Sequence, residues 1–190
     1  MYVFPFSFVC GITYPGDRMR KEEVQLIKEI LKELLDKTAL MQMDQYIQHG
    51  DITTLTHCIL VAYYSYALDL KLHLHSDAKS LITGALLHDY FLYDWHEKEE
   101  WHRWHGFKHA KFAYQNARRD YPINEREAEI IRKHMWPLNI CPPTCREAWV
   151  VNFVDTFSGL MEVVIAFRLF QALRHRWIHR PLQLITGEPL

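Results

Sequence analysis

The sequence predicts an all-α protein, and three observations support that prediction. Apolar residues recur at three- and four-residue spacing along most of the chain, which is the period of an α-helix. Residues that commonly cap helices stand before several of these stretches. The sequence contains no long alternation of apolar and polar residues, which a half-buried strand would require. We therefore expect a bundle of about six to eight helices.

The predicted helices and connecting segments follow one another closely. Helices are expected over residues 21–37, 39–48, 52–72, 77–89, 107–119, 124–136 and 145–175. An irregular segment rich in tryptophan, tyrosine and histidine covers residues 90–104, and residues 176–190, with two prolines, are expected to form a loop. A chain organised in this way has short connections and a shared apolar core.

Capping residues mark the starts of several predicted helices. Asp51 and Ser76 precede the helices that begin near residues 52 and 77. Asn124 and Thr144 are each followed by a glutamate three residues later, which is the pattern of a capping box. In the helix that ends near Asp89, Gly84 and the next residue, an alanine, are small enough to let another helix approach closely.

Composition limits the possible functions. The chain has 190 residues, of which 49% are hydrophobic, enough for one sizeable core. Because the net charge is −1, no basic excess is available to neutralise phosphates, and a nucleic-acid polymer is not an expected partner. No membrane span is expected, because no apolar run approaches about 20 residues. The 4 cysteines are too few for a disulfide scaffold, which favours a cytoplasmic protein.

The first 18 residues differ from the rest of the chain. They are apolar, they lack the basic start of a signal peptide, and the stretch from Met19 to Glu22 resembles a natural beginning. We expect residues 1–18 to be a loosely attached extension and residues 19–190 to form a single helical domain.

A histidine and an aspartate stand side by side after an apolar run that ends at Leu87. Buried His88 and Asp89 would be unfavourable unless they were paired or bound to metal. Further histidines and aspartates occur on the predicted helices at His57, His109, His134 and Asp155. One inward histidine is usually an ordinary core residue, but all six of these polar residues together would destabilise a core without metal. The sequence therefore predicts a metal site.

The order of these residues, H…HD…H…H…D, resembles the HD-domain superfamily of metal-dependent phosphohydrolases. The resemblance extends from about residue 57 to residue 162 and implies an HD-domain helical bundle. It implies metal bound by His57, His88, Asp89 and Asp155. The intervening His109 and His134 resemble those of members with a second metal, in which Asp89 would bridge both ions. Hydrolases of diadenosine tetraphosphate and cyclic-dinucleotide phosphodiesterases share this extended pattern, although the Gly-Tyr-Pro signature of the latter is not found.

Two positions leave the assignment open. The third histidine ligand is either His105 or His109, and the run from His109 to Ala113 resembles the family's His-Pro-x-x-Gly/Ala helix opening. His109 is therefore favoured, and His105 would then face the substrate. Many family members have a lysine after the last aspartate, where this chain has Thr156, so one possible anchor for a substrate phosphate is missing.

The predicted site favours hydrolysis. Imidazole and carboxylate groups suit Fe, Mn, Zn or Co equally well, so we expect one or two divalent ions without choosing the metal. Such ions lower the pKa of a bound water towards about 7, which makes it a nucleophile. The predicted reaction is attack of this water on a small phosphorylated substrate, a nucleotide or dinucleotide, with Asp89 and Lys108 as the catalytic residues.

Basic and aromatic residues near the motif are candidates for binding that substrate. Lys108, Lys111 and Lys133 flank the motif histidines and are predicted to bind phosphate, as is His105; solvated surface charge is the competing interpretation for each lysine. The aromatic segment over residues 90–104 forms either a lid that stacks on a base or, as we favour, a loop anchored on the core.

Four other interpretations remain open. An HD-type di-iron oxygenase would use the same ligands to cleave a C–C or C–P bond with O₂, and a non-catalytic module would bind only nucleotide or metal. Cys141 and Cys145 resemble half of a zinc site, but no second pair accompanies them, so ordinary thiols are favoured. The apolar residues 163–170 pack either internally or against a second subunit, so a homodimer is possible.

Overall fold

A computed structural model describes residues 19–97, 100, 104–166 and 171–187. In these ranges the protein is all-α, with eight α-helices, as predicted. The long helices are α2 (Lys21–Lys37), α3 (Thr54–Leu72), α4 (Ala78–Leu87), α5 (His105–Asp120), α6 (Glu125–Lys133) and α7 (Arg146–Ala166). The predicted extension over residues 1–18 lies outside the described residues, so the proposed division at residue 19 stays a prediction.

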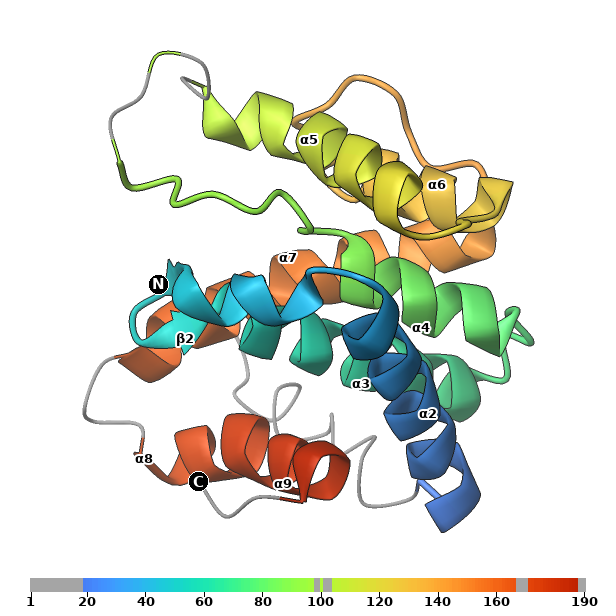
Figure 1. The fold of residues 1–190 in the computed structure, drawn as a ribbon. Coiled ribbons are helices and arrows are strands. Elements are labelled where there is room, and N and C mark those ends of the chain that lie inside the picture. The colour runs from blue at the N-terminus through green and yellow to red at the C-terminus, as the bar shows by residue number, and fades with distance from the viewer. Residues whose placement is uncertain (1–18, 98–99, 101–103, 167–170, 188–190) are drawn as a thin grey trace, which may run out of the picture.

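Helices α3, α4 and α7 form the middle of the molecule (Figure 1). Helices α5 and α6 lie together on one side of them, and the helical C-terminal region lies on the other. The side chains of Leu60, Leu86, Ile130 and Val151, from four different helices, are fully buried between these elements. Burial of such side chains contributes about 1.5–3 kcal/mol each, so this core fixes the ends of the helices relative to one another.

Gly84 lets α4 and α6 approach closely, as the sequence predicted. A Cβ atom at Gly84 would lie 2.5 Å from Cδ1 and 2.9 Å from Cβ of Ile130. No side chain larger than hydrogen fits without a shift of one helix, because Cβ of Ile130 is attached directly to its backbone. Ile130 lies one turn before His134, and Gly84 lies one turn before His88. The contact therefore brings the C-terminal ends of the two helices together.

A short hairpin replaces part of a predicted helix. Residues 39–48 do not form one helix, since they contain the 3₁₀-helix η2 (Leu40–Gln45) and the strand β1 (Ile47–His49). Strand β1 pairs antiparallel with β2 (Ile52–Thr53), and Gly50 takes a positive φ of 62° in the turn between them. Strands of two and three residues are too short to produce a recognisable alternation of apolar and polar residues, so they could not be predicted from the sequence.

Two predicted caps of the middle helices are wrong by one or two residues. The side chain of Thr53, not that of Asp51, caps α3 by accepting a hydrogen bond from the backbone N–H of Thr56. Asp51 instead accepts two hydrogen bonds from Arg174, at 2.9 and 2.8 Å. Helix α4 is capped by Asp77, the residue after Ser76. In both cases the observed capping residue lies one or two positions after the predicted one.

The two predicted capping boxes have different outcomes. Asn124 and Glu127 form the expected box at the start of α6. The box at the start of α7 is not formed, because Thr144 donates its hydroxyl to Glu129. Glu147 instead accepts hydrogen bonds from the backbone N–H of Asp77 and from a neighbouring arginine. Both side chains thus connect α7 to earlier elements of the chain.

The C-terminal region is helical over residues 171–186, which contradicts the loop predicted from residue 176 onward. Helix α7 ends at Ala166, not near residue 175, and it is followed by α8 (Gln171–Arg174), the π-helix η4 (His175–His179) and α9 (Arg180–Thr186). Pro181 lies in the first turn of α9, which continues directly from η4, and the carbonyl of Trp177, four residues earlier, accepts a hydrogen bond from the hydroxyl of Tyr64. Proline was therefore a misleading stop signal here.

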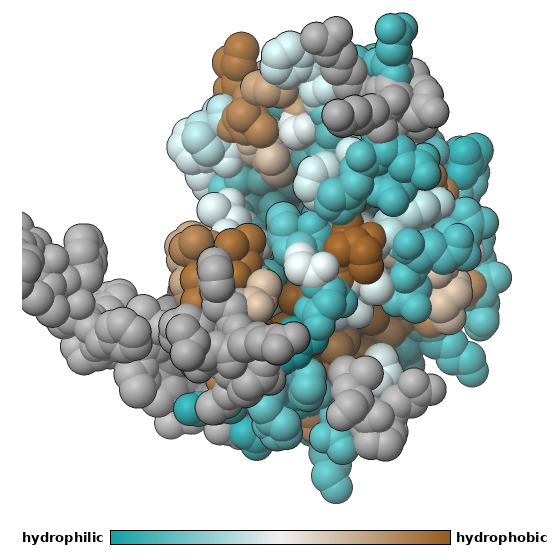
Figure 2. Space-filling view, turned by 90° about the vertical axis from the view of Figure 1, so that its left-hand side faces the viewer, coloured by the Kyte–Doolittle hydropathy of each residue, from teal (hydrophilic) through white to brown (hydrophobic). Residues whose placement is uncertain are grey.

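Helix α7 is long and apolar enough to cross a membrane, by length and composition only. Its inner face nevertheless carries buried polar residues and packs against α3, α4 and α6. Its outer face exposes Trp149, Phe153 and Leu160, with 42%, 61% and 61% of their surfaces accessible. Figure 2 shows apolar groups (brown) among hydrophilic side chains (teal) on one face of the molecule. The length and apolar composition of α7 are therefore those of a core helix. The described residues contain no clear membrane span.

Candidate metal centre

The structure brings the six motif residues together at one place. His57 projects from α3, His109 from α5 and Asp155 from α7. His88 and His134 are the C-cap residues of α4 and α6, and Asp89 follows His88 directly. The five residues other than Asp155 are buried, with at most 4% of their surface exposed, and Asp155 is partly buried. Their helices converge because the apolar faces of these helices share one core.

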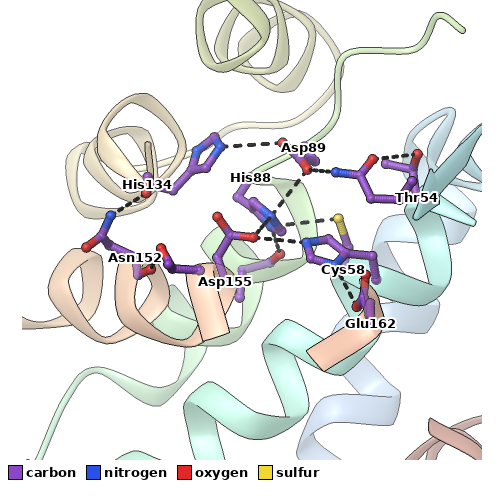
Figure 3. A network of polar contacts seen from close by, with 12 residues as sticks. Thr54, Cys58, His88, Asp89, His134, Asn152, Asp155 and Glu162 are labelled. Carbon is purple, nitrogen blue, oxygen red and sulfur yellow. Dashed lines mark hydrogen bonds and ion pairs between the residues drawn. The ribbon is translucent and has the colours of Figure 1, made fainter. Parts of the chain in front are cut away.

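His57, His88 and Asp155 form one part of the cluster, which we call the α3/α7 half. Oδ1 of Asp155 lies 3.0 Å from Nε2 of His57 and 3.5 Å from Nε2 of His88. Figure 3 shows Asp155 and His88 pointing toward one another from α7 and the end of α4. Oδ1 of Asp155 therefore lies within 3.5 Å of imidazole nitrogens from two different helices.

Asp89, His109 and His134 form the second part, which we call the α5/α6 half. Nε2 of His109 lies 2.9 Å from Nε2 of His134. Oδ1 of Asp89 lies 3.3 Å from His109 and 3.4 Å from His134. The other carboxylate oxygen, Oδ2, lies 3.6 Å from Nε2 of His88. Asp89 thus turns one oxygen toward each half of the cluster (Figure 3).

The donor atoms fit a bound metal ion. Nε2 of His88 and Oδ1 of Asp89 are buried and have no hydrogen-bond partner in the described structure, which is unfavourable for polar atoms unless an ion binds them. Donors on one ion with bonds of about 2.1 Å lie about 3 Å apart, close to the separations found in both halves. Three overlapping groups of these residues have donor atoms within 4.8 Å of one another. Histidine and carboxylate donors suit a divalent transition metal.

Nearby acidic groups favour the protonated form of both histidines in the α3/α7 half. Burial lowers the pKa of His57, but the charges and hydrogen bonds of Glu162 and Asp155 outweigh burial and raise this pKa well above its usual value. Burial likewise opposes the charge on His88, whose pKa is raised by Cys58 and by the two aspartates of the cluster. The pKa of Asp155 is lowered because its histidine partners overcome the effect of burial. A proton therefore carries the positive charge that an ion would bring.

The α5/α6 half differs in the protonation of its two histidines. Burial and the like charges of His88 and His109 lower the pKa of His134 despite its contact with Asp89. The pKa of His109 is raised, because Asp89 outweighs the effect of burial. Burial raises the pKa of Asp89, but the surrounding histidines shift it well below its usual value. This half therefore contains a neutral imidazole and a carboxylate, both ready to bind a cation.

The geometry separates His105 from His109. His105 begins α5, and its Nδ1 lies 2.8 Å from the hydroxyl of Tyr93. Its ring stacks on that of His109, with centroids 4.7 Å apart, so it lies beside the cluster while His109 contacts Asp89 and His134. The structure thus favours His109 over His105 at the third histidine position, and a contact of His105 with substrate stays a prediction.

The predicted phosphate-binding lysines are not part of the cluster. Lys133 lies 3.6 Å from Glu129, a residue of its own helix. Lys111 is exposed and lies two residues, or about 200°, around α5 from His109. Lys108 is partly buried next to His109 in the chain. The substrate-binding roles of these lysines, and the catalytic role of Lys108, stay predictions.

The aromatic segment before α5 packs against the hairpin. The indole N–H of Trp95 donates to the backbone carbonyl of Ile47, at 3.2 Å, and the Trp95 ring stacks on His105 with centroids 5.2 Å apart. Phe91 and Tyr93 are buried. This packing supports the interpretation of an anchored loop for the described part of the segment; residues 98–99 and 101–103 lie outside the described residues.

Sequence reasoning missed the residues that support the cluster. Nε2 of Gln48, in the unpredicted strand β1, donates to Oδ2 of Asp89 at 2.8 Å, and Oε1 of Gln48 accepts from Thr54 (Figure 3). Glu162, seven residues after Asp155 on α7, contacts His57 and was not among the predicted site residues. The short hairpin hid Gln48, whereas the helical spacing of seven residues from Asp155 to Glu162 was a usable signal.

With this geometry established, comparisons with known proteins give the family. The model of the HD domain matches residues 54–160, more than half of the chain. The chain belongs to the HD-domain family. This match confirms the resemblance stated from the sequence, and membership implies the superfamily of metal-dependent phosphohydrolases. No curated protein and no solved structure matches the chain.

Proposed function

We propose that this HD-domain protein hydrolyses a small phosphorylated substrate, a nucleotide or dinucleotide, with one or two divalent transition-metal ions. The observation that carries the proposal is the division of Asp89 between two groups of histidines. One carboxylate oxygen lies near His109 and His134 and the other near His88. Two neighbouring ions would grip the attacking and leaving oxygens of a phosphoester and acidify a water molecule.

The residues of the chain would perform distinct tasks. His57, His88 and Asp155 would hold one ion, His109 and His134 the other, and Asp89 would contact both. Since Asp155 has 14% of its side chain exposed and the surrounding histidines have at most 5%, we propose that substrate approaches from its side. Burial of the other donors excludes bulk water, which strengthens electrostatic interactions at the reacting phosphate. Family membership supports this assignment, and the substrate class is inferred from the family members that share the extended histidine pattern.

Elemental analysis followed by an activity panel tests the proposal. Freshly purified protein should contain iron, manganese, zinc or cobalt. It should hydrolyse at least one member of a panel of nucleotides, dinucleoside polyphosphates, cyclic dinucleotides and sugar phosphates without O₂. The variant His88→Ala should lose both metal and turnover. His175→Ala is the matched control, because His175 is exposed on η4, and it should retain both.

One observation favours a second candidate, a di-iron oxygenase. Thr156 follows Asp155 where many relatives have lysine, and Lys133 already contacts Glu129, so the support for a phosphate group is weaker than that for the metals. O₂ uptake and an EPR signal from a mixed-valent iron pair, with no phosphoester turnover, would favour the oxygenase. Metal binding with neither activity would favour a non-catalytic module. Retention of full metal content by His88→Ala would overturn the site itself.

A further inference from the structure

The four histidines of the cluster are held in two different ways. Nδ1 of His88, His109 and His134 each lies near a backbone carbonyl of its own helix, at 2.7, 3.0 and 2.9 Å, three or four residues earlier in the chain. Nδ1 of His57 instead lies 2.8 Å from Oε1 of Glu162, which is 105 residues away on α7. Only His57, among these four, has a carboxylate behind it.

The contact with Glu162 fixes which nitrogen of His57 faces the cluster. An ionised carboxylate only accepts hydrogen bonds, so Nδ1 of His57 is the donor. In neutral imidazole the lone pair is then on Nε2, which points at Asp155. Glu162 has 0% and His57 1% of its surface exposed, so no solvent replaces this hydrogen bond. Glu162 and Asp155 therefore contact opposite ring nitrogens of His57, Nδ1 and Nε2.

The burial of Glu162 is unfavourable for a purely structural residue. Its Oε2 atom has no hydrogen-bond partner among the described residues, and a buried carboxylate with an unsatisfied oxygen destabilises a core. The neighbouring core positions Val151 and Val154 on α7 are apolar and buried. An apolar side chain at position 162 would pack without this penalty, so the carboxylate requires a role beyond packing.

We propose that Glu162 is a positioning residue that makes His57 a metal ligand. It holds the imidazole ring in place, keeps the proton on Nδ1 and increases the basicity of Nε2 toward the ion. Loss of such a partner typically weakens metal binding about 10–100-fold. The inference rests on the metal binding in the proposed function, and not on the identity of the substrate.

Chelator competition on purified full-length variants tests this role, with zinc as the probe. Glu162→Gln keeps the shape and one acceptor oxygen but removes the charge, and Glu162→Leu removes both. Ser158→Ala is the matched control, because Ser158 lies one turn earlier on the same buried face and its hydroxyl has no partner within the described structure. We expect zinc in the α3/α7 half to bind about 10-fold more weakly in Glu162→Gln, more weakly still in Glu162→Leu, and unchanged in Ser158→Ala.

A second readout distinguishes positioning from packing. In the zinc-loaded wild type, ¹H–¹⁵N spectra should show the His57 proton on Nδ1, and this signal should shift or disappear in Glu162→Gln while circular dichroism stays unchanged. The inference is overturned if Glu162→Gln binds zinc as tightly as the wild type. It is also overturned if this variant loses helical structure and the zinc of both halves together. A wild type that binds no metal would instead refute the proposed function.

Discussion

The two halves of the cluster are supported at different distances along the chain. In the α5/α6 half, both histidines are oriented by carbonyl groups within one helical turn. In the α3/α7 half, His57 depends on Glu162 and Asp155, from a helix that begins more than 80 residues later. The ring orientation of His109 and His134 is therefore set within their own helices, whereas that of His57 is set only when α3 and α7 pack together. Asp89 belongs to both halves, and the variants below test whether they are separable.

Replacement of Asp89 should have the largest effect, because its two oxygens face different halves. The isosteric variant Asp89→Asn should lose metal from both halves, and its turnover should fall by more than about 100-fold, beyond the usual effect of a residue behind a ligand. Elemental analysis and phosphoester turnover measure this. Asp36→Asn, an exposed position on α2, is the control. Full metal content in Asp89→Asn would show that Asp89 is not a ligand shared by the two halves.

Variants of one half should leave the other half occupied. Asp155→Ala should lose the ion of the α3/α7 half, and His134→Ala should lose that of the α5/α6 half, each with a decrease in affinity of at least about 10-fold. Metal-to-protein ratios and chelator titrations distinguish the two variants. If both variants lose all metal equally, the cluster is a single site and the two halves are not independent.

Lower pH should weaken the α3/α7 half more than the α5/α6 half. Metal must displace protons from histidine. The pKa values of both histidines of the α3/α7 half, His57 and His88, are raised, whereas in the α5/α6 half that of His109 is raised and that of His134 is lowered. A decrease from about pH 8 to about pH 6 should therefore reduce affinity most in the half that contains His57. Isothermal titrations of Asp155→Ala and His134→Ala at both pH values measure this, and equal slopes would contradict the distinction.

The same protons affect the protein without metal, with the opposite sign. Because the pKa values of His57 and His88 are raised in the folded state, their contribution to the free energy of unfolding is complete below the ordinary histidine pKa of about 6.5. That contribution is lost as the pH rises through the raised values. Bound protons therefore stabilise this half at lower pH, and bound metal stabilises it at higher pH, where the protons are lost.

Replacement of Gln48 should have the smallest effect. Gln48 donates one hydrogen bond to Asp89, and such a bond contributes about 1 kcal/mol. Gln48→Ala should therefore weaken metal binding about fivefold, with comparable effects on both halves because Asp89 serves both. Gln45→Ala, at an exposed position just before the hairpin, controls for local disturbance in the same chelator titration. A loss confined to one half would show that Gln48 does not act through Asp89.

The parts of the site that depend on local helical geometry could be predicted from the sequence, whereas contacts between distant residues could not. Helical periodicity was sufficient for α2 and for the inward face of α3, and the spacing of histidines and aspartates identified the cluster. The support of the α5/α6 half is implicit in helical geometry, since a carbonyl lies one turn before each histidine. The support of the α3/α7 half was not predicted, because it joins residues 105 positions apart.

Short or non-local features account for the remaining errors. The hairpin that presents Gln48 consists of two very short strands, and its effect on Asp89 depends on the three-dimensional path of the chain. The helix α9 was missed because proline normally stops helices, whereas here α9 continues from η4 through Pro181. The caps of α3 and α4 were displaced because neighbouring residues were equally suitable, and tertiary contacts with Arg174 and Glu147 decided between them.

Gly84 has a consequence for anyone who engineers this protein. A glycine inside a helix is a routine target for raising heat resistance, because alanine there usually adds up to about 1 kcal/mol. Here the added methyl group would collide with Ile130 and force apart the two helix ends that carry His88 and His134. A library screened for thermal tolerance alone should therefore keep this position fixed, because a stable variant with alanine here would hold His88 and His134 too far apart for the candidate metal centre.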